Sequence, residues 1–184
     1  DLIFVYDQQG QLLGEYSNTG AMLREYAWVG STPIAMFVPN GSSTTIYHLH
    51  TDHLETPRIV TDAAGNVRWR WLAEPFGSTV AENNPSNLGA VAQNLRFPGQ
   101  YFDQESGLHY NNNRDYDSTI GRYVQSDPIG LNGGINTYAY VEGNPLSFTD
   151  PNGLQAITAG DLARTLPAAG GVCAATGGTA CAAA

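Results

Sequence analysis

Lysine is absent from this 184-residue sequence, and its eight strongly basic residues are all arginine. Seventeen acidic residues leave a formal net charge of −9. Because proteins bind a phosphate backbone mainly by neutralising it with Lys and Arg, this balance argues against nucleic-acid binding by residues 1–154. The lack of lysine also excludes a P-loop, which uses that side chain to reach the phosphates.

Cysteines and long apolar runs are also scarce. Cys173 and Cys181 both lie among the last dozen residues, where they cannot cross-link the fold and have no zinc-ligand pattern around them. No run of 18 apolar residues occurs. The N-terminus has neither a signal-peptide pattern nor a Met, so we expect a fragment or processed product of a longer chain.

Short alternating or aromatic runs recur between turn signals over most of the chain, whereas helical periodicity is nearly absent before residue 150. In the run Val67–Trp71, Val67, Trp69 and Trp71 alternate with Arg68 and Arg70, as expected for a strand with one buried face. The pattern predicts an all-β fold. The other predicted strands and hairpins span residues 3–6, 12–16, 23–29, 45–50 and 57–61.

These units share a Tyr, a turn rich in Asp or Asn with Gly, and a β-branched or Leu strand, at a spacing of about twenty residues. Such a unit cannot bury its apolar face alone, so neighbouring hairpins must stack. An ordinary β-sandwich with Tyr-rich strands is the alternative that the periodicity leaves open.

Two composition changes divide the chain. Residues 81–95 are polar, lack aromatics and predict a surface loop. From Gln155 to Ala184 the chain contains 11 Ala, 5 Gly and no aromatic residue, so it lacks the bulk for a core, although 161–166 could form a short helix. A boundary is therefore expected near Leu154.

One five-residue phrase, Asp-Pro-x-Gly-Leu, occurs at 127–131 and again at 150–154. The segment between them, with a predicted strand at 137–141, reads as a hairpin that could bring Asp150 beside Asp127. Paired carboxylates in a partly buried site can divide the roles of acid and base needed to activate water against an amide. Asp-Pro with a following Gly is also a good turn, and both interpretations stay open at this point.

Three stretches, at 47–58, 96–111 and 121–154, resemble the repeat-associated core of Rhs proteins, the bacterial YD-repeat polymorphic toxins related to the C component of insecticidal toxin complexes. The resemblance covers about residues 1–154. It implies stacked YD-repeat β-hairpins that form part of a spiralling hollow shell, at 1–95. It further implies a repeat-associated core that ends in an inward-turned autocleavage plug, at 96–154, and the start of a variable toxin region, at 155–184.

The same resemblance implies an intramolecular aspartyl protease. Asp127 and Asp150 would be its catalytic pair, the cut would separate Leu154 from Gln155, and Arg122 would support a carboxylate. The alternative is a non-catalytic YD-repeat container or adhesion module in which the Asp-Pro turns only shape the plug.

Partners and destination are likewise implied by the resemblance. They are the chain's own toxin segment held inside the shell, an immunity protein, a secretion apparatus such as type VI secretion, and delivery of a secreted effector into target cells. The Ala/Gly-rich residues 168–184 could begin a membrane-inserting toxin. A flexible leader before a further domain is the preferred interpretation, because these weakly apolar residues barely reach a spanning length.

Two clusters of polar residues contain the side chains that bind metals. His48, His50 and His53 with Asp52 could bind a metal, and the Asn- and Asp-rich residues 111–117 could bind calcium. Both are better explained as shell turns, because the first matches a recurrent family phrase and the second lacks EF-hand spacing. We therefore expect no metal and no cofactor.

Overall fold

The computed structural model describes residues 2–158 and 160–162. Cys173, Cys181, the tail at 168–184 and most of the predicted helix at 161–166 lie outside the described residues. Within that part of the chain, no helix is both long and apolar enough to cross a bilayer.

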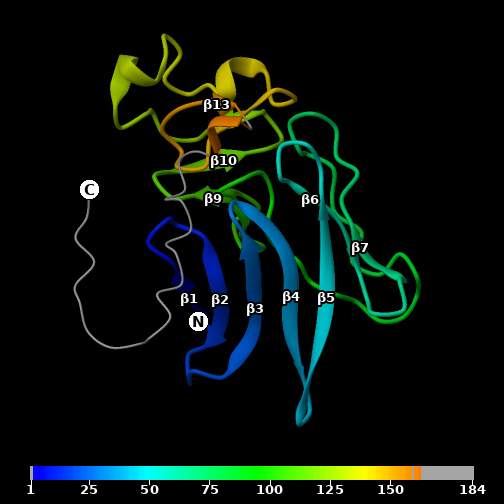
Figure 1. Cartoon of the computed structure of the whole chain (residues 1–184). Coiled ribbons are helices and arrows are strands. Elements are labelled where there is room, and N and C mark those ends of the chain that lie inside the picture. Colours follow the sequence, from blue (N-terminus) through cyan, green and yellow to red (C-terminus); the bar gives the residue numbers. More distant parts are fainter. Residues whose placement is uncertain (1, 159, 163–184) are drawn as a thin grey trace, which may run out of the picture.

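Seven antiparallel strands form one sheet in which every strand pairs with its neighbour along the chain (Figure 1). This meander is the arrangement that short turns between alternating strands dictate, because a tight turn returns the chain beside the strand it has just left. The strands are β1 (Leu2–Tyr6), β2 (Leu12–Ser17), β3 (Met22–Val29), β4 (Thr32–Asn40), β5 (Ser43–Thr51), β6 (Pro57–Thr61) and β7 (Val67–Arg70).

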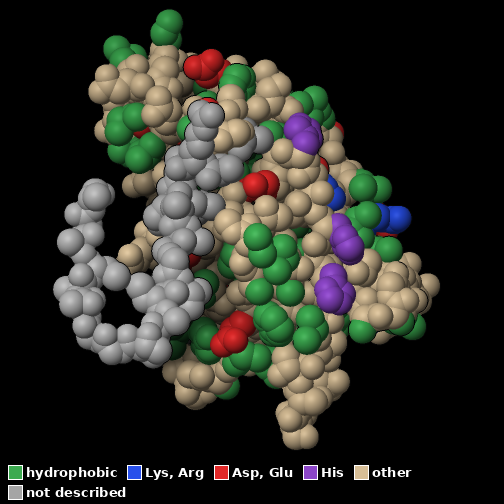
Figure 2. Space-filling model, viewed as in Figure 1, with side chains coloured by type: hydrophobic (Ala, Val, Ile, Leu, Met, Phe, Trp, Pro, Cys, Tyr) green, Lys and Arg blue, Asp and Glu red, His purple; other side chains and the backbone are tan. Residues whose placement is uncertain are grey.

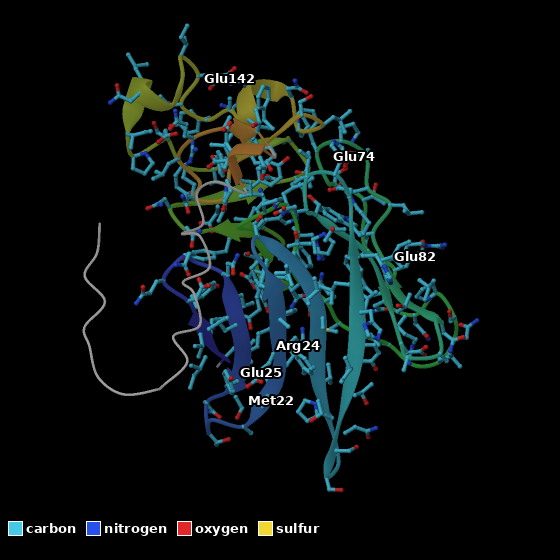
Figure 3. The ribbon with its side chains drawn as sticks, in the orientation of Figure 1. Met22, Arg24, Glu25, Glu74, Glu82 and Glu142 are labelled. Atoms are coloured by element: carbon cyan, nitrogen blue, oxygen red, sulfur yellow. The ribbon has the colours of Figure 1, made fainter. Side chains whose placement is uncertain are left out.

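The smaller strands pack beyond one end of the large sheet, where Figure 1 shows β9, β10 and β13 together, and the segment after β7 runs beside that strand. A four-stranded sheet has the order β11-β10-β9-β8, and β12 pairs with β13. Figure 3 shows Arg24 and Glu25 on the large sheet, and Glu142 among the smaller elements beyond the end of that sheet. The elements are β8 (Tyr101–Phe102), β9 (His109–Asn111), β10 (Arg114–Asp117), β11 (Arg122–Tyr123), the 3-10 helices η1 (Gly130–Gly133) and η2 (Val141–Gly143), β12 (Phe148–Thr149) and β13 (Ile157–Thr158).

An aspartate organises several turns in the same way. Asp7 Oδ1 accepts the N–H groups of residues 9 and 11, and Asp62 Oδ1 accepts those of residues 64 and 66. Asp and Asn favour turns because the side chain can replace a backbone acceptor in this manner.

The antiparallel sheets confirm the predicted all-β fold built of hairpins. The predicted boundaries at residues 95 and 154 stay predictions.

An aromatic cluster joins the large sheet to the smaller elements. Phe97 stacks on Tyr140 at 5.5 Å between ring centroids, and Tyr140 lies 4.6 Å from Tyr116. Trp69 and Trp71 are each 1% exposed, as their alternation with two arginines predicted. Aromatic pairs of this kind contribute about 0.5–1.5 kcal/mol each beyond the burial of their area. The cluster thus anchors β10 and the segment around η2 against the large sheet.

Two local predictions were wrong. Residues 81–90 are largely exposed, but 91–95 enter the core, where Val91 and Leu95 are 6% exposed and Gln93 is 1% exposed. Burial of these polar side chains is possible because other parts of the chain form hydrogen bonds with some of their amide groups. Asn94, for example, donates to the Tyr101 hydroxyl at 2.8 Å.

The segment 137–141 is not a regular strand. It makes a single bridge, between Arg122 and Ala139. Val141 and Glu142 then turn the chain with φ of 43° and 55°, values that a strand cannot contain.

Burial of His109 makes the fold acid-sensitive. The side chain is 2% exposed, and its Nδ1 lies 2.8 Å from Gln100 Oε1. Burial lowers its pKa from 6.5 to about 3, and the charge of Arg96 adds to this. Because the unfolded chain binds this proton first, the contribution of His109 to stability is complete above about pH 6.5 and is lost as the pH falls towards about 3.

We expect the free energy of unfolding to fall by about 2 kcal/mol from this group between about pH 7 and pH 5. Urea titrations at the two pH values measure the fall. His109→Gln should lose correspondingly less over the same interval, because Gln does not titrate. An equal loss in both proteins would rule out His109 as the source.

Candidate active site

Asp150 follows β12 directly and closes the turn at 150–154. Its Oδ1 accepts the N–H of Leu154 at 2.9 Å and that of Gln155 at 3.1 Å. The side chain is 2% exposed. The turn predicted for this phrase is therefore present, and its carboxylate contacts the N–H of the peptide bond between Leu154 and Gln155.

Asp127 heads the other copy of the phrase and accepts a backbone N–H nearer to itself in the sequence. Its Oδ1 accepts the N–H of Ile129 at 3.0 Å, and its own N–H donates to the Thr137 carbonyl at 2.8 Å. The side chain is 3% exposed. This backbone hydrogen bond closes the loop from 127 to 137. The other carboxylate oxygen, Oδ2, faces Arg114.

Arg114, on β10, joins the two aspartates. Its Nη2 lies 3.0 Å from Asp127 Oδ2 and 3.2 Å from Asp150 Oδ2, and its side chain is 2% exposed. A buried carboxylate requires a partner, and here one guanidinium provides for both. The chain therefore brings together two carboxylates that lie 23 residues apart in the sequence, with an arginine between them.

The Leu154 carbonyl lies on the Asp127 side of the site. A Cβ placed on Gly133 would come within 3 Å of both the Leu154 carbonyl oxygen and Asp127 Oδ2. A glycine at this position therefore lets the carboxylate and the carbonyl approach each other. Since N–H and C=O point in opposite directions across a trans peptide, the bond after Leu154 lies between the two aspartates.

Tyr123 supplies a fixed hydrogen-bond donor to Asp150. Its hydroxyl donates to Asp150 Oδ2 at 2.8 Å and accepts from Asn111 Nδ2 at 2.8 Å. Burial, reinforced by the negative charge of Asp150, raises the pKa of Tyr123 far above its usual value. The hydroxyl therefore stays protonated and orients the carboxylate.

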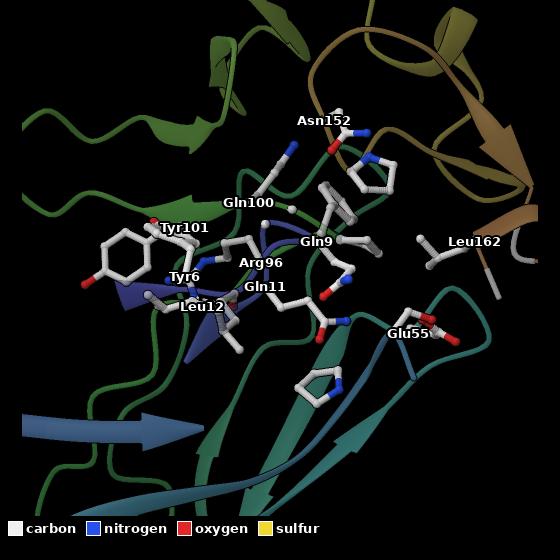
Figure 4. A pocket seen from close by; sticks show the side chains of 18 of the residues that line it. Tyr6, Gln9, Gln11, Leu12, Glu55, Arg96, Gln100, Tyr101, Asn152 and Leu162 are labelled. Carbon is white, nitrogen blue, oxygen red and sulfur yellow. Dashed lines mark hydrogen bonds between the residues drawn. The ribbon is translucent and has the colours of Figure 1, made fainter. Parts of the chain in front are cut away.

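Two open cavities meet at this peptide bond. One, of about 700 Å³, is lined by Leu154 and Gln155, and Figure 4 shows Arg96, Gln100 and Tyr101 around it together with Asn152 and Leu162. The second, of about 680 Å³, is lined by the same two residues and by Arg114 and Asp150. Leu154 is half-buried and Gln155 is exposed, so the residues on either side of the bond contact solvent although the carboxylates themselves are buried.

The Teneurin YD-shell family matches residues 33–144 of this sequence. The chain belongs to that family. It is 47% identical over 109 residues to the double-stranded DNA deaminase toxin A of Burkholderia cenocepacia, covering 59% of this chain and 8% of the relative. It is 41% identical over 129 residues to toxin protein Tse5 of Pseudomonas aeruginosa, covering 70% of this chain and 9% of the relative.

Among solved structures, the crystal structure of TcdB2-TccC3-TEV matches this YD-shell chain with a TM-score of 0.59 at 19% identity, covering 83% of this chain and 9% of that one. That likeness shows the fold. The chain spans less than a tenth of the length of these relatives. The predicted relationship to the Rhs and YD-repeat toxins is confirmed. The YD-shell fold therefore takes the place of the ordinary β-sandwich that the periodicity had left open.

Arg122 of the YD-shell chain, which the resemblance suggested as a support for a carboxylate, points to solvent instead. It is exposed on β11, and its guanidinium lies 5.2 Å from the ring centroid of Tyr138. Successive residues of a strand face opposite sides, so Tyr123 points inward and Arg122 outward. Among the described residues, the ion pairs of Asp127 and Asp150 are made with Arg114.

Arg114 and Tyr123 are the site residues that sequence reasoning missed. The alternating sequence of β10, in which Arg114 and Tyr116 are buried and the residues after them less so, carried a faint signal for the arginine. The sequence instead predicts a turn at 111–117, because the segment supplies oxygen ligands without the spacing of a calcium-binding loop.

The candidate metal ligands lie on strands and turns of the YD-shell chain. His48 and His50 are exposed on one face of β5, and Figure 2 shows histidines at the surface. His53 Nε2 lies 2.9 Å from a backbone carbonyl, and the Asp52 carboxylate pairs with Arg58 at 2.8 Å. Over residues 2–158 and 160–162, no three His, Cys, Asp or Glu side chains form a metal-binding group.

We expect Tyr123→Phe to lower the free energy of unfolding of the YD-shell chain by about 1–2 kcal/mol, because both hydrogen bonds of the buried hydroxyl are lost. Urea unfolding measures the loss. Tyr138→Phe, at a more exposed tyrosine, is the matched control. An equal loss in both variants would show that the hydroxyl on Asp150 has no special role.

Proposed function

We propose that this YD-shell region cleaves its own chain, with Asp127 and Asp150 hydrolysing the peptide bond between Leu154 and Gln155. The observation that carries the proposal is the placement of that bond. Its N–H donates to Asp150 Oδ1 at 3.1 Å, while its carbonyl oxygen shares with Asp127 Oδ2 the space in front of Gly133.

The hydrolysis needs one acid and one base. A water oxygen bonds to the Leu154 carbonyl carbon, the bond to nitrogen breaks, Leu154 keeps a carboxylate and Gln155 leaves with a free amine. Asp127 lies on the carbonyl side, and Asp150 on the nitrogen side. One carboxylate takes the proton of water while a carboxyl supplies a proton to the departing nitrogen, which is the division of roles that paired carboxyls perform.

Arg114 balances the charge throughout this exchange. Its Nη2 contacts an oxygen of each aspartate, so the positive charge stabilises whichever of the two carboxyls is ionised. The substrate is part of the same chain and already lies between the carboxyls. Effective concentrations in such intramolecular reactions are very high, so a single turnover needs no binding step.

The biological role that we propose is release of an enclosed toxin. The fold similarity to TcdB2-TccC3 and the relatives named as toxins support a shell that encloses a toxin segment. In our proposal that segment begins at Gln155. In this proposal the whole protein is a secreted bacterial effector delivered to target cells, for example by type VI secretion, and the toxin has an immunity protein.

A non-catalytic role remains the competing proposal, and the turn contacts favour it. Oδ1 of both aspartates accepts backbone N–H groups, as Asp7 and Asp62 do in ordinary turns of the sheet. A container or adhesion module in which these residues only shape the chain predicts no self-cleavage.

Intact mass of the freshly made full-length protein under denaturing conditions tests the proposal. We expect two products that meet between Leu154 and Gln155. An unsplit chain, or a split that an external protease makes and that persists without the aspartates, would favour the non-catalytic container.

A further inference from the structure

Four consecutive side chains of the β9–β10 turn bind four consecutive backbone carbonyls, each 39 residues further along the chain. We call residues 111–114 the Asn–Arg ladder. The four hydrogen bonds are Asn111 Nδ2 to the Asp150 carbonyl (2.8 Å), Asn112 Nδ2 to Pro151 (2.9 Å), Asn113 Nδ2 to Asn152 (2.9 Å) and Arg114 Nε to Gly153 (2.6 Å).

The ladder ends one residue before the carbonyl of the proposed cut. Its bonds go to main-chain oxygens, which are the same whatever side chains the bound segment carries. A donor for each successive carbonyl holds the segment but would accept any main chain. The register is set by Gly153, because a Cβ at that position would overlap the Asn111 carbonyl oxygen, and a shift by one residue would place a side chain there. The ladder together with Gly153 therefore fixes which peptide bond lies between the aspartates.

The surroundings of the bound segment support this interpretation. A Cβ on Gly99 would overlap the Pro151 backbone, so a second part of the chain also lies in close contact with the segment. Asn112 has φ of 52°, in the left-handed region that asparagine tolerates better than most residues. The chain thus adopts an uncommon conformation at a rung of the ladder.

We propose that Asn112 and Asn113 are positioning residues that select the bond to be cut by holding the preceding segment through its main-chain carbonyls. This inference rests on the proposed self-cleavage. Asn111 and Arg114 also contact Tyr123 and the aspartates, so their substitution would disturb several functions at once. The two middle rungs separate positioning from the chemistry.

Asn113 gives the sharpest test because it is exposed, so that substitutions there leave the core intact. Asn113→Asp has nearly the same shape but replaces the amide donor with a carboxylate that repels the Asn152 carbonyl. Asn113→Gln is larger but keeps the donor. A purely steric role would favour Asp over Gln, whereas donation to the carbonyl favours Gln over Asp.

In the full-length protein, the cleavage rate constant is measured by intact mass during refolding from denaturant. We expect Asn113→Asp to slow cleavage about tenfold, Asn113→Gln to stay within about threefold of the wild type, and the pH dependence to be unchanged in shape. Asn18→Asp is the matched control, because it makes the same change of charge at an exposed asparagine in the turn between β2 and β3, outside the ladder. It should cleave at the wild-type rate.

Hydrogen exchange in the uncleavable Asp127→Asn background gives a readout that does not depend on the reaction. We expect Asn113→Asp to speed exchange of the Leu154 and Gln155 amides, since both donate to Asp150 only while the turn is held. Unchanged exchange, or an Asp variant that cleaves as fast as the Gln variant, overturns the positioning role. A wild type that never cleaves refutes the proposed function instead, and exchange still decides the ladder.

Discussion

Asp127→Asn and Asp150→Asn are each expected to reduce the rate of cleavage after Leu154 by roughly a thousandfold, which leaves the full-length chain unsplit. Asparagine matches aspartate in shape and keeps an oxygen for the turn hydrogen bonds, but it can neither take nor give the proton that hydrolysis requires. Intact mass at fixed times after synthesis measures the loss.

Asp115→Asn is the matched control for both variants. This aspartate lies on β10 next to Arg114, but its carboxylate accepts from Gln125 at 2.7 Å and faces away from the cleavage site. It should therefore cleave normally. Wild-type splitting in both Asp127→Asn and Asp150→Asn would refute catalysis by the pair and return these residues to the role of turn formers.

Arg114→Gln is expected to abolish cleavage and to lower the free energy of unfolding by about 3–5 kcal/mol. The arginine and both carboxylates are nearly inaccessible to water, so its removal leaves two buried negative charges without their shared counter-charge. Urea unfolding measures the loss. To compare unsplit chains, Arg114→Gln is added to the Asp127→Asn protein. There the single charge of Asp150 loses its counter-charge, so we expect the lower end of this range.

A combined variant separates the charge effect from simple loss of packing. Arg114→Met together with Asp127→Asn and Asp150→Asn removes all three charges, so we expect it to regain most of the stability while remaining uncleaved. Arg122→Gln, at the exposed arginine that the sequence favoured, should change stability by less than about 0.5 kcal/mol. If Arg122→Gln blocked cleavage and Arg114→Gln did not, the structural assignment would be wrong.

Much of this molecule follows from local patterns. Val67, Trp69 and Trp71 alternate with arginines, and the strand they predict buries both tryptophans. Because consecutive strands joined by short turns pair with each other, the meander of the large sheet needed no knowledge of distant contacts. The repeated Asp-Pro-x-Gly-Leu phrase likewise identified Asp127 and Asp150, which the fold brings to one arginine.

What no local pattern contains is the register between distant segments. Arg114 and Arg122 are both arginines on short strands, and only the pairing of β10 with its neighbours decides that the first faces the aspartates and the second faces solvent. The burial of residues 91–95 and the loss of the strand at 137–141 have the same origin, since each depends on partners elsewhere in the fold. The Asn–Arg ladder shows this most clearly: three asparagines indicate a turn by themselves, and they become donors to the segment before Leu154 only because the fold places 111–114 beside 150–153.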